Sequence, residues 1–300
     1  MADLEYLTVT DALALILAGV EPLSGERVSL LEALGRVVIE PIVANDSLPP
    51  FANSSMDGYA LRAADISSAT EEQPASLRVV ADIAAGTAKE VSVKPGTAAR
   101  IMTGAPLPQG ADAVIPVEDT NEEWRDDERP LPEQILVCRS VQSGDYVRQI
   151  GEDIISGQEV IAPGHILRPQ EIGVLAALGV SRVMVRRRPR IGVLATGDEL
   201  IDVDQALTPG KIRNSNSYAQ SAQVIALGAD LIPLGVARDT EEDVRAKLQI
   251  GVDLEADLLI SSAGVSVGAY DVVKAVLEKE GNVGFWRVRM RPGKPLAFGT

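Results

Sequence analysis

Four acidic residues each follow an apolar segment that the sequence predicts to be a strand of one parallel sheet, or begin the helix after it. They are Asp198, Glu199, Asp239 and Asp271. Each alone fits a helix cap or a solvated acid, because aspartate side chains accept hydrogen bonds from free backbone N–H groups. Together, at one edge of a sheet, they could hold a hard divalent cation through oxygen ligands. Such a cation would let an acidic protein bind an anionic substrate.

A loop of small residues lies next to these acids. Residues 261–271 read Ser-Ser-Ala-Gly-Val-Ser-Val-Gly-Ala-Tyr-Asp and lead into a predicted helix, so their backbone N–H groups could bind a phosphate at the helix N-terminus. The loop matches neither the dinucleotide-binding fingerprint nor a Walker A loop. A tight structural turn would explain the glycines equally well.

A basic segment supplies positive charge to match these acids. Arg287, Arg289 and Arg291 are predicted to lie on one face of a strand, and Lys294 lies in the following turn. Such a set can bind a tetrahedral oxyanion. An ordinary basic strand edge is the alternative interpretation.

The elements that must position these residues alternate regularly from Arg190 onward. Apolar strands are predicted over 191–195, 231–236, 258–261 and 283–288, with helices over 217–227, 241–248 and 272–280. This alternation predicts βαβ units and a parallel sheet covered on both faces. Ligands of such sheets bind beyond the carboxyl ends of the strands, where the acidic residues fall.

The first 190 residues have a different character. Thr10 is predicted to cap a helix over 11–18, and a second short helix is predicted over 30–34, before Gly35. From Ser47 onward, alternating apolar and polar residues broken by glycine and proline predict a β-rich insertion. The basic run 186–188 beside Pro189 is typical of a solvated connector.

Composition excludes several classes of function. The chain has 28 Lys and Arg against 43 Asp and Glu, a formal charge of −15, and only 3% aromatic residues, which argues against nucleic-acid binding. Its single cysteine, Cys138, and single histidine, His165, exclude intramolecular disulfides and Cys/His zinc sites. No apolar run approaches the roughly 18 residues of a membrane span, and the acidic N-terminus lacks a secretory signal. The sequence therefore predicts no membrane association and a cytoplasmic location.

Several motifs resemble one known family in its order. Residues 51–60 read Phe-Ala-Asn-Ser-Ser-Met-Asp-Gly-Tyr-Ala, residues 100–106 read Arg-Ile-Met-Thr-Gly-Ala-Pro, and Gly-Ala-Asp-Ala-Val and Gly-Glu-Asp-Ile follow at 110–114 and 151–154. Further on come Thr-Gly-Asp-Glu-Leu at 196–200, Asn-Ser-Asn at 214–216, Gly-Val-Ser-Val-Gly at 264–268 and Pro-Gly-Lys-Pro at 292–295. The set resembles the MoeA family of molybdopterin molybdenumtransferases, related to the gephyrin E domain.

The resemblance implies the last step of molybdenum cofactor assembly, in which adenylylated molybdopterin and molybdate give the cofactor and AMP with Mg²⁺. It implies a multidomain α/β homodimer, with a possible partner in an adenylyltransferase of the MogA type. The expected domains are 1–46 with 145–188, a β-rich inserted domain at 47–144, and a three-layer α/β/α molybdopterin-binding domain at 189–300, similar to MogA. The family's C-terminal β-barrel is absent from this sequence, which ends inside the α/β domain as a fragment or a truncated member would.

The resemblance also assigns site residues. The expected catalytic residues are Asp57, Thr103, Glu199, Asp239 and Asp271, the last three as Mg²⁺ ligands. The expected substrate-binding residues are Arg148, Asp153, Thr196, Asp198, Ser262, Gly264, Ser266, Gly268, Arg287, Arg291 and Lys294. Asp57, Thr103, Arg148 and Asp153 would lie at a cleft completed by the partner subunit, and Arg291 with Lys294 would hold molybdate.

The sequence departs from the family at two positions in the phosphate-facing loop. Ala263 replaces a usual glycine, and Ala269 replaces a commonly acidic residue. Two other functions remain open: a MogA-like adenylyltransferase, whose loop usually runs Gly-Gly-Thr-Gly, and a non-catalytic scaffold of the gephyrin kind.

Overall fold

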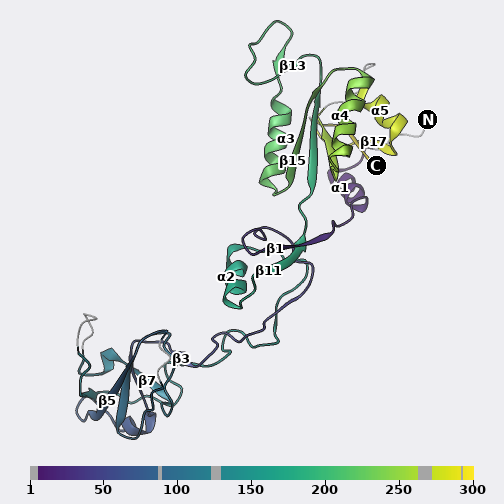
Figure 1. Ribbon diagram of the computed structural model, residues 1–300. Coiled ribbons are helices and arrows are strands. Elements are labelled where there is room, and N and C mark those ends of the chain that lie inside the picture. Colours follow the sequence, from purple (N-terminus) through teal and green to yellow (C-terminus); the bar gives the residue numbers. More distant parts are fainter. Residues whose placement is uncertain (1–5, 87–89, 123–129, 263–271, 292) are drawn as a thin grey trace. The chain divides into compact units, whose positions relative to one another are not determined.

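The computed structural model describes residues 6–86, 90–122, 130–262, 272–291 and 293–300 (Figure 1). The chain divides into two compact units, one of Met1–Val28, Gly35–Ile39 and Met184–Thr300, the other of Ser29–Leu34 and Glu40–Val183. The domain boundaries expected from the sequence, 1–46 with 145–188, 47–144 and 189–300, stay a prediction.

The first unit contains the predicted parallel sheet. Its central strand β12 (Arg190–Thr196) pairs in parallel with β15 (Asp230–Ala237) on one side and β16 (Leu258–Ser261) on the other. In this register Thr196 lies opposite Ala237, and Leu194 lies opposite Ser261. The carboxyl ends of the three strands therefore meet at one edge, as the sequence predicts.

Helices cover both faces of this sheet (Figure 1). On one face Val224 of α3 (Ser215–Ala226) packs against Ile191 and Val193 of β12. On the other, α4 (Glu241–Asp253) and α5 (Val272–Glu280) pack against Leu194 and the apolar side chains of β15. Successive strand residues point to opposite faces, so the continuous apolar run in β12 serves both layers. The three-layer α/β/α prediction is confirmed.

Helix α1 and a hairpin complete this unit. Helix α1 (Val9–Ala18) begins two residues earlier than predicted, because Thr8 rather than Thr10 caps it through a reciprocal box with Asp11. Strands β17 (Val283–Arg287) and β18 (Pro295–Gly299) pair antiparallel in a sheet of their own, so the prediction that residues 283–288 add a strand to the parallel sheet is wrong. The expectation that Arg289 and Arg291 continue the strand is wrong. The chain turns directly after β17, where the Met290 N–H donates to the Val288 carbonyl oxygen at 2.8 Å.

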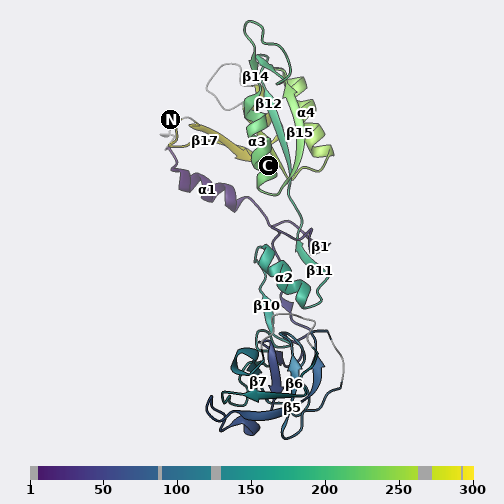
Figure 2. The same cartoon turned by 90° about the vertical axis from the view of Figure 1, so that its left-hand side faces the viewer.

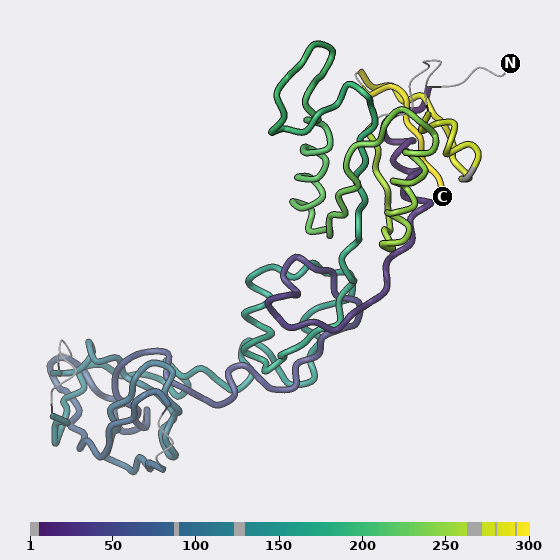
Figure 3. Tube along the Cα trace, turned by 45° about the horizontal axis from the view of Figure 1, so that its top comes forward, coloured from purple at the N-terminus to yellow at the C-terminus, as the bar shows by residue number. Residues whose placement is uncertain are grey.

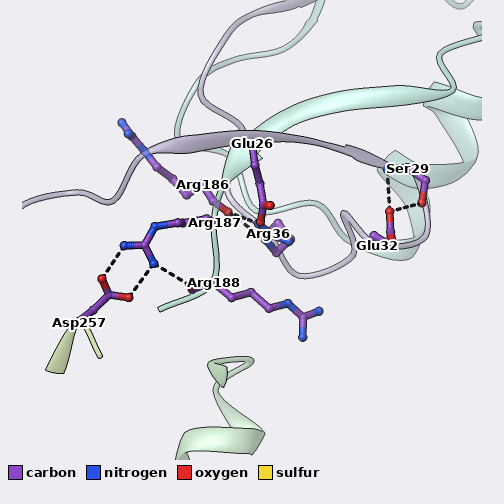
Figure 4. Close-up of polar contacts among 8 residues, drawn as sticks. All are labelled: Glu26, Ser29, Glu32, Arg36, Arg186, Arg187, Arg188 and Asp257. Atoms are coloured by element: carbon purple, nitrogen blue, oxygen red, sulfur yellow. Dashed lines mark hydrogen bonds and ion pairs between the residues drawn. The ribbon is translucent and has the colours of Figure 1, made fainter. Parts of the chain in front are cut away.

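The basic run 186–188 makes specific bonds instead of being only solvated (Figure 4). Arg187 donates two hydrogen bonds to the Asp257 carboxylate, which also accepts the Arg190 N–H at 2.8 Å. The side chain of Arg186 donates to the Leu23 carbonyl oxygen at 2.6 Å, and the largely buried Arg36 donates to the Arg186 carbonyl oxygen. These bonds attach the connector to its own unit.

A short β-pair lies next to this connector. It consists of β1 (Gly25–Ser29) and β11 (Arg182–Arg186). The helix expected over 30–34 is a turn closed by Ser29, whose N–H and hydroxyl donate to Glu32. A five-residue segment offers too few hydrogen bonds to offset the cost of nucleating a helix.

The second unit is built on a mixed five-stranded sheet, as the β-rich insertion predicts. The strand order is β7 (Ala113–Pro116), β4 (Gly58–Leu61), β6 (Thr97–Ile101), β5 (Ala75–Ile83) and β8 (Gln134–Val137). Only the β5–β6 pair is parallel. One face is buried around Tyr59, Leu61 and Ile115, with the short helix η1 (Ala63–Ile66) packed there.

Smaller elements accompany this sheet. They are β2 (Ile42–Val43), β3 (Asn53–Ser54), η2 (Val117–Asp119), β9 (Val147–Arg148), β10 (Glu159–Ile161) and α2 (Pro169–Ala177). At the start of α2, hydrogen bonds from the Arg168 side chain and N–H lower the pKa of Glu171 to about 2. A carboxylate in the first turn also complements the helix dipole.

Candidate active site

The loop after β12 begins with a glycine that the geometry requires. Gly197 has a φ of +145°, which side chains rarely adopt, and its N–H donates to the Ala237 carbonyl oxygen at 3.2 Å. The loop then forms β13 (Leu200–Ile201), which pairs with β14 (Ile212–Arg213), and between them it extends away from the sheet (Figure 3). The sharp turn at Gly197 places the next two acids directly at the carboxyl edge.

Two acidic residues in neighbouring loops form reciprocal hydrogen bonds. The Asp198 N–H donates to Asp239 Oδ2 at 3.2 Å, and the Asp239 N–H donates to Asp198 Oδ1 at 3.4 Å. The ammonium of Lys211 donates to the Asp198 carbonyl oxygen. The structure thus brings together two of the four acids singled out in the sequence.

Glu199 lies beside this pair, and no described residue forms a hydrogen bond with its carboxylate. A Cβ added to Gly197 would lie 2.5 Å from Glu199 Oε2, so the glycine leaves room for the carboxylate. The Glu199 carbonyl oxygen accepts the Ile212 N–H at 2.8 Å, which fixes the backbone beneath the exposed side chain. The Glu199 carboxylate therefore lies close to the turn at Gly197.

The acidic side chains at this edge are candidate ligands for a divalent cation. Within the described ranges no group of three or more His, Cys, Asp or Glu side chains is arranged to hold a metal ion, and Asp271 lies outside them. Asp198 and Asp239 each direct one carboxylate oxygen to a backbone N–H, and no described residue forms a hydrogen bond with the other oxygen. Mg²⁺ usually binds through one or two carboxylates together with substrate phosphates, so this pair fits its chemistry.

Other expected substrate-binding residues lie at the same edge. Thr196 ends β12 with a side chain that is mostly buried, and the Ser262 N–H donates to the Leu194 carbonyl oxygen at 3.4 Å. Buried Asn214 caps α3 by accepting the Ser217 N–H. Outside the described residues lie Gly264, Ser266, Gly268 and Asp271, together with Ala263 and Ala269.

The expected cations lie around the β17–β18 hairpin. Arg287 ends β17 opposite Pro295, so Lys294 immediately precedes the residue paired with it, and Arg291 is exposed in the turn. Lys294 Nζ lies 4.6 Å from the centre of the Tyr6 ring. Hydrogen bonding from Lys294, and less strongly from Arg287, lowers the pKa of the Tyr6 hydroxyl. No motif in the sequence indicated Tyr6, which is distant from these cations along the chain.

The second unit brings together two further expected pairs. Asp57 Oδ1 accepts both the N–H and the hydroxyl of Thr103, each at 2.7 Å. Arg148 forms an ion pair with Asp153. Asp57 precedes Gly58, where a Cβ would lie 1.9 Å from the Ile115 carbonyl oxygen, so only glycine allows β4 to approach β7 there. The cleft with a partner subunit stays a prediction.

An α/β/α unit with carboxylates at the carboxyl edge of its strands defines a ligand-binding α/β protein, here joined to a β-rich second unit. Residues 7–179 match the family described as "MoeA N-terminal region (domain I and II)". Residues 192–300 match the "Probable molybdopterin binding domain". The chain belongs to the MoeA family.

Individual relatives agree with this membership. The chain is 38% identical over 276 residues to the molybdopterin molybdenumtransferase of Nostoc, covering 92% of this chain and 61% of that protein. It is 39% identical over 280 residues to the enzyme of the same name from Haemophilus influenzae, covering 93% and 66%. A crystal structure of the molybdopterin biosynthesis moeA protein from Pyrococcus horikoshii superposes with a TM-score of 0.81 at 32% identity, covering 98% of this chain and 72% of that one. The chain thus spans just under two thirds of these two curated relatives.

The α-helices in the described ranges are 9 to 13 residues long. None of them is both long enough and apolar enough to cross a bilayer.

Proposed function

We propose that this chain is a molybdopterin molybdenumtransferase, which inserts molybdenum from molybdate into adenylylated molybdopterin and releases AMP. The observation that carries the proposal is the Asp198–Asp239 pair at the carboxyl edge of the parallel sheet. It lies in the segment that matches a molybdopterin-binding domain. The names of the Nostoc and Haemophilus influenzae relatives support the same reaction.

Asp198 and Asp239 would hold Mg²⁺ together with the pyrophosphate of the adenylate, and Glu199 and Asp271 stay predicted ligands. Bound there, Mg²⁺ would neutralise the charge that develops as AMP leaves. The backbone hydrogen bonds between the two aspartates keep both loops in place before the substrate arrives. Such preorganisation avoids an ordering cost during the reaction.

Arg287, Arg291 and Lys294 would hold molybdate. Guanidinium groups bind oxyanions through two parallel hydrogen bonds, whereas lysine acts as a point charge. Fixing molybdate next to the pterin sulfurs converts a bimolecular encounter into a positioned one. The reaction needs no nucleophilic side chain, in keeping with a chain that has one cysteine and one histidine.

The second unit would contribute Asp57, Thr103, Arg148 and Asp153 to a cleft in a homodimer. The two hydrogen bonds from Thr103 support this role, because they fix the Asp57 carboxylate at the end of its loop. We further propose that the substrate comes from a MogA-type adenylyltransferase and that the reaction takes place in the cytoplasm.

Release of AMP tests the proposal. Purified protein is incubated with adenylylated molybdopterin and Mg²⁺, with and without micromolar molybdate, and AMP is quantified by chromatography. We expect release that depends on molybdate. Binding of the adenylate without release would favour a non-catalytic scaffold, and formation of the adenylate from molybdopterin and ATP would favour an adenylyltransferase.

A further inference from the structure

The segment before α1 is attached to the end of β17 (Figure 2). The Leu7 N–H donates to the Arg287 carbonyl oxygen at 2.9 Å, and the Arg289 N–H donates to the Leu7 carbonyl oxygen at 2.8 Å. Leu7 thereby forms a parallel bridge with Val288, which is almost fully buried. On the other side of Leu7, the capping box of Thr8 and Asp11 fixes the start of α1. Tyr6 is therefore held at a defined place beside Arg287.

The turn that carries Lys294 is fixed to the same backbone. The Val288 N–H donates to the Lys294 carbonyl oxygen at 2.7 Å. Val288 is thus bonded to Leu7 on one side and to Lys294 on the other. This arrangement brings the Lys294 ammonium over the half-buried ring of Tyr6, 4.6 Å from its centre.

Tyr6 supplies an aromatic ring and a hydroxyl oxygen beside two cations, Lys294 and Arg287. Like charges repel each other, so Lys294 and Arg287 would separate in the absence of an acceptor. The Tyr6 ring attracts the Lys294 ammonium over it, and Lys294, more strongly than Arg287, lowers the pKa of the Tyr6 hydroxyl. Arg289 differs, because its charge acts on the Asp11 carboxylate, whose pKa is lowered mainly by hydrogen bonds from Thr8 and to a smaller extent by Arg289.

We propose that Tyr6 is a positioning residue that holds Lys294 and Arg287 together, so that both can bind one tetrahedral oxyanion. The inference rests on the proposed function for its substrate, molybdate. Tyr6 does not react and contributes by keeping the two cations close before the anion arrives. Its removal weakens oxyanion binding and leaves the later release of AMP unchanged.

The test compares Tyr6→Phe and Tyr6→Leu with the wild-type protein. The Phe variant keeps the ring under Lys294 and loses the hydroxyl, and the Leu variant loses both. Tyr218→Phe is the matched control, because it removes an exposed hydroxyl of the same unit that donates to Asp202 at 2.9 Å. AMP release is measured against molybdate concentration, and molybdate binding is measured separately by calorimetry.

We expect the KM for molybdate to rise roughly fivefold in Tyr6→Phe and more in Tyr6→Leu, with kcat within about twofold and the control unchanged. An unchanged KM, or a loss confined to kcat, would overturn the inference. If the wild-type protein releases no AMP, the molybdate binding measured by calorimetry tests the role of Tyr6 instead. If the Tyr6 variants then bind molybdate more weakly than the wild-type protein, the positioning role of Tyr6 is supported although the proposed function fails. If all the proteins bind molybdate equally, or none of them binds it, the positioning role of Tyr6 is overturned as well.

Discussion

Asp198 and Asp239 each donate a backbone N–H to the carboxylate of the other, although 41 residues separate them in the chain. The two loops that follow β12 and β15 are therefore joined by two hydrogen bonds at the sheet edge. One oxygen of each carboxylate accepts the N–H of the other loop, and no described residue forms a hydrogen bond with the second oxygen. The charge of each aspartate and its structural hydrogen bond can consequently be separated by substitution.

Asp239→Asn is the first such substitution. The amide oxygen of asparagine still accepts the Asp198 N–H, so we expect the melting temperature to stay within a few degrees. The lost charge weakens cation binding, and we expect half-maximal AMP release to need about tenfold more Mg²⁺. A Mg²⁺ titration of the initial rate measures this.

The control for that substitution is Asp204→Asn, which makes the same charge change in the exposed loop after β13. It should leave the Mg²⁺ dependence unchanged. Equal shifts in both variants would indicate a general effect of net charge and would contradict the assignment of Asp239 to the site.

Gly197→Ala tests the turn that presents Glu199. The substitution is strained at a φ of +145°, and the new methyl group would displace the Glu199 carboxylate. We expect a loss of about 1–3 kcal/mol in the free energy of unfolding and a clear fall in AMP release. Gly210→Ala is the comparison, because Gly210 has a φ of +80° but no atom within 4 Å of the added Cβ. If both variants lose activity equally, backbone strain rather than Glu199 is responsible.

Thr103→Val tests the Asp57 contact in the second unit. Valine keeps the volume of threonine and its backbone N–H but removes the hydroxyl that donates to Asp57 at 2.7 Å. We expect kcat/KM to fall about tenfold, since a hydrogen bond to a charged group is lost. Thr103→Ser keeps the hydroxyl and should retain most of the activity. Full activity of the valine variant would remove Thr103 from the site.

The sequence was sufficient to predict three strands of the parallel sheet and the acids at their carboxyl ends, because both depend on local patterns, but it could not show that the strand at 283–288 pairs with β18 instead. Apolar strands alternating with helices indicate the α/β/α layers, and the carboxyl ends of parallel strands meet at one edge. The reciprocal bonds of Asp198 and Asp239 follow from that edge only once the register of β12 and β15 is known.

Contacts between segments that lie far apart in the chain could not be predicted from such local patterns. Tyr6 reaches Lys294 through a single bridge of Leu7 with Val288, which leaves no periodic signal in either segment. The run 186–188 resembles any solvated basic connector, and only the tertiary position of Asp257 distinguishes Arg187 from Arg188. The short helix expected over 30–34 failed for a local reason, since Ser29 and Glu32 close a turn instead.

The ion pair of Arg187 with Asp257 predicts a pH dependence of stability. Hydrogen bonding from Arg187, aided by the Arg190 N–H, lowers the pKa of Asp257 below its usual value. Because the folded pKa is depressed, the pair stabilises the fold above the unfolded pKa of about 3.9, and this contribution is lost as pH falls through the folded pKa. Asp257→Asn should therefore cost about 1–3 kcal/mol at pH 7, and its difference from the wild-type protein should shrink at lower pH.

Urea unfolding between pH 7 and pH 3 measures this difference. Glu255→Gln is the matched control, because Glu255 is 86% exposed and pairs with Arg190 at 3.1 Å. Exposed pairs contribute little, so this variant should follow the wild-type protein at every pH. A difference for Asp257→Asn that stays constant from pH 7 to pH 3 would mean that the carboxylate charge does not stabilise the connector. Arg187 would then act through its packing alone.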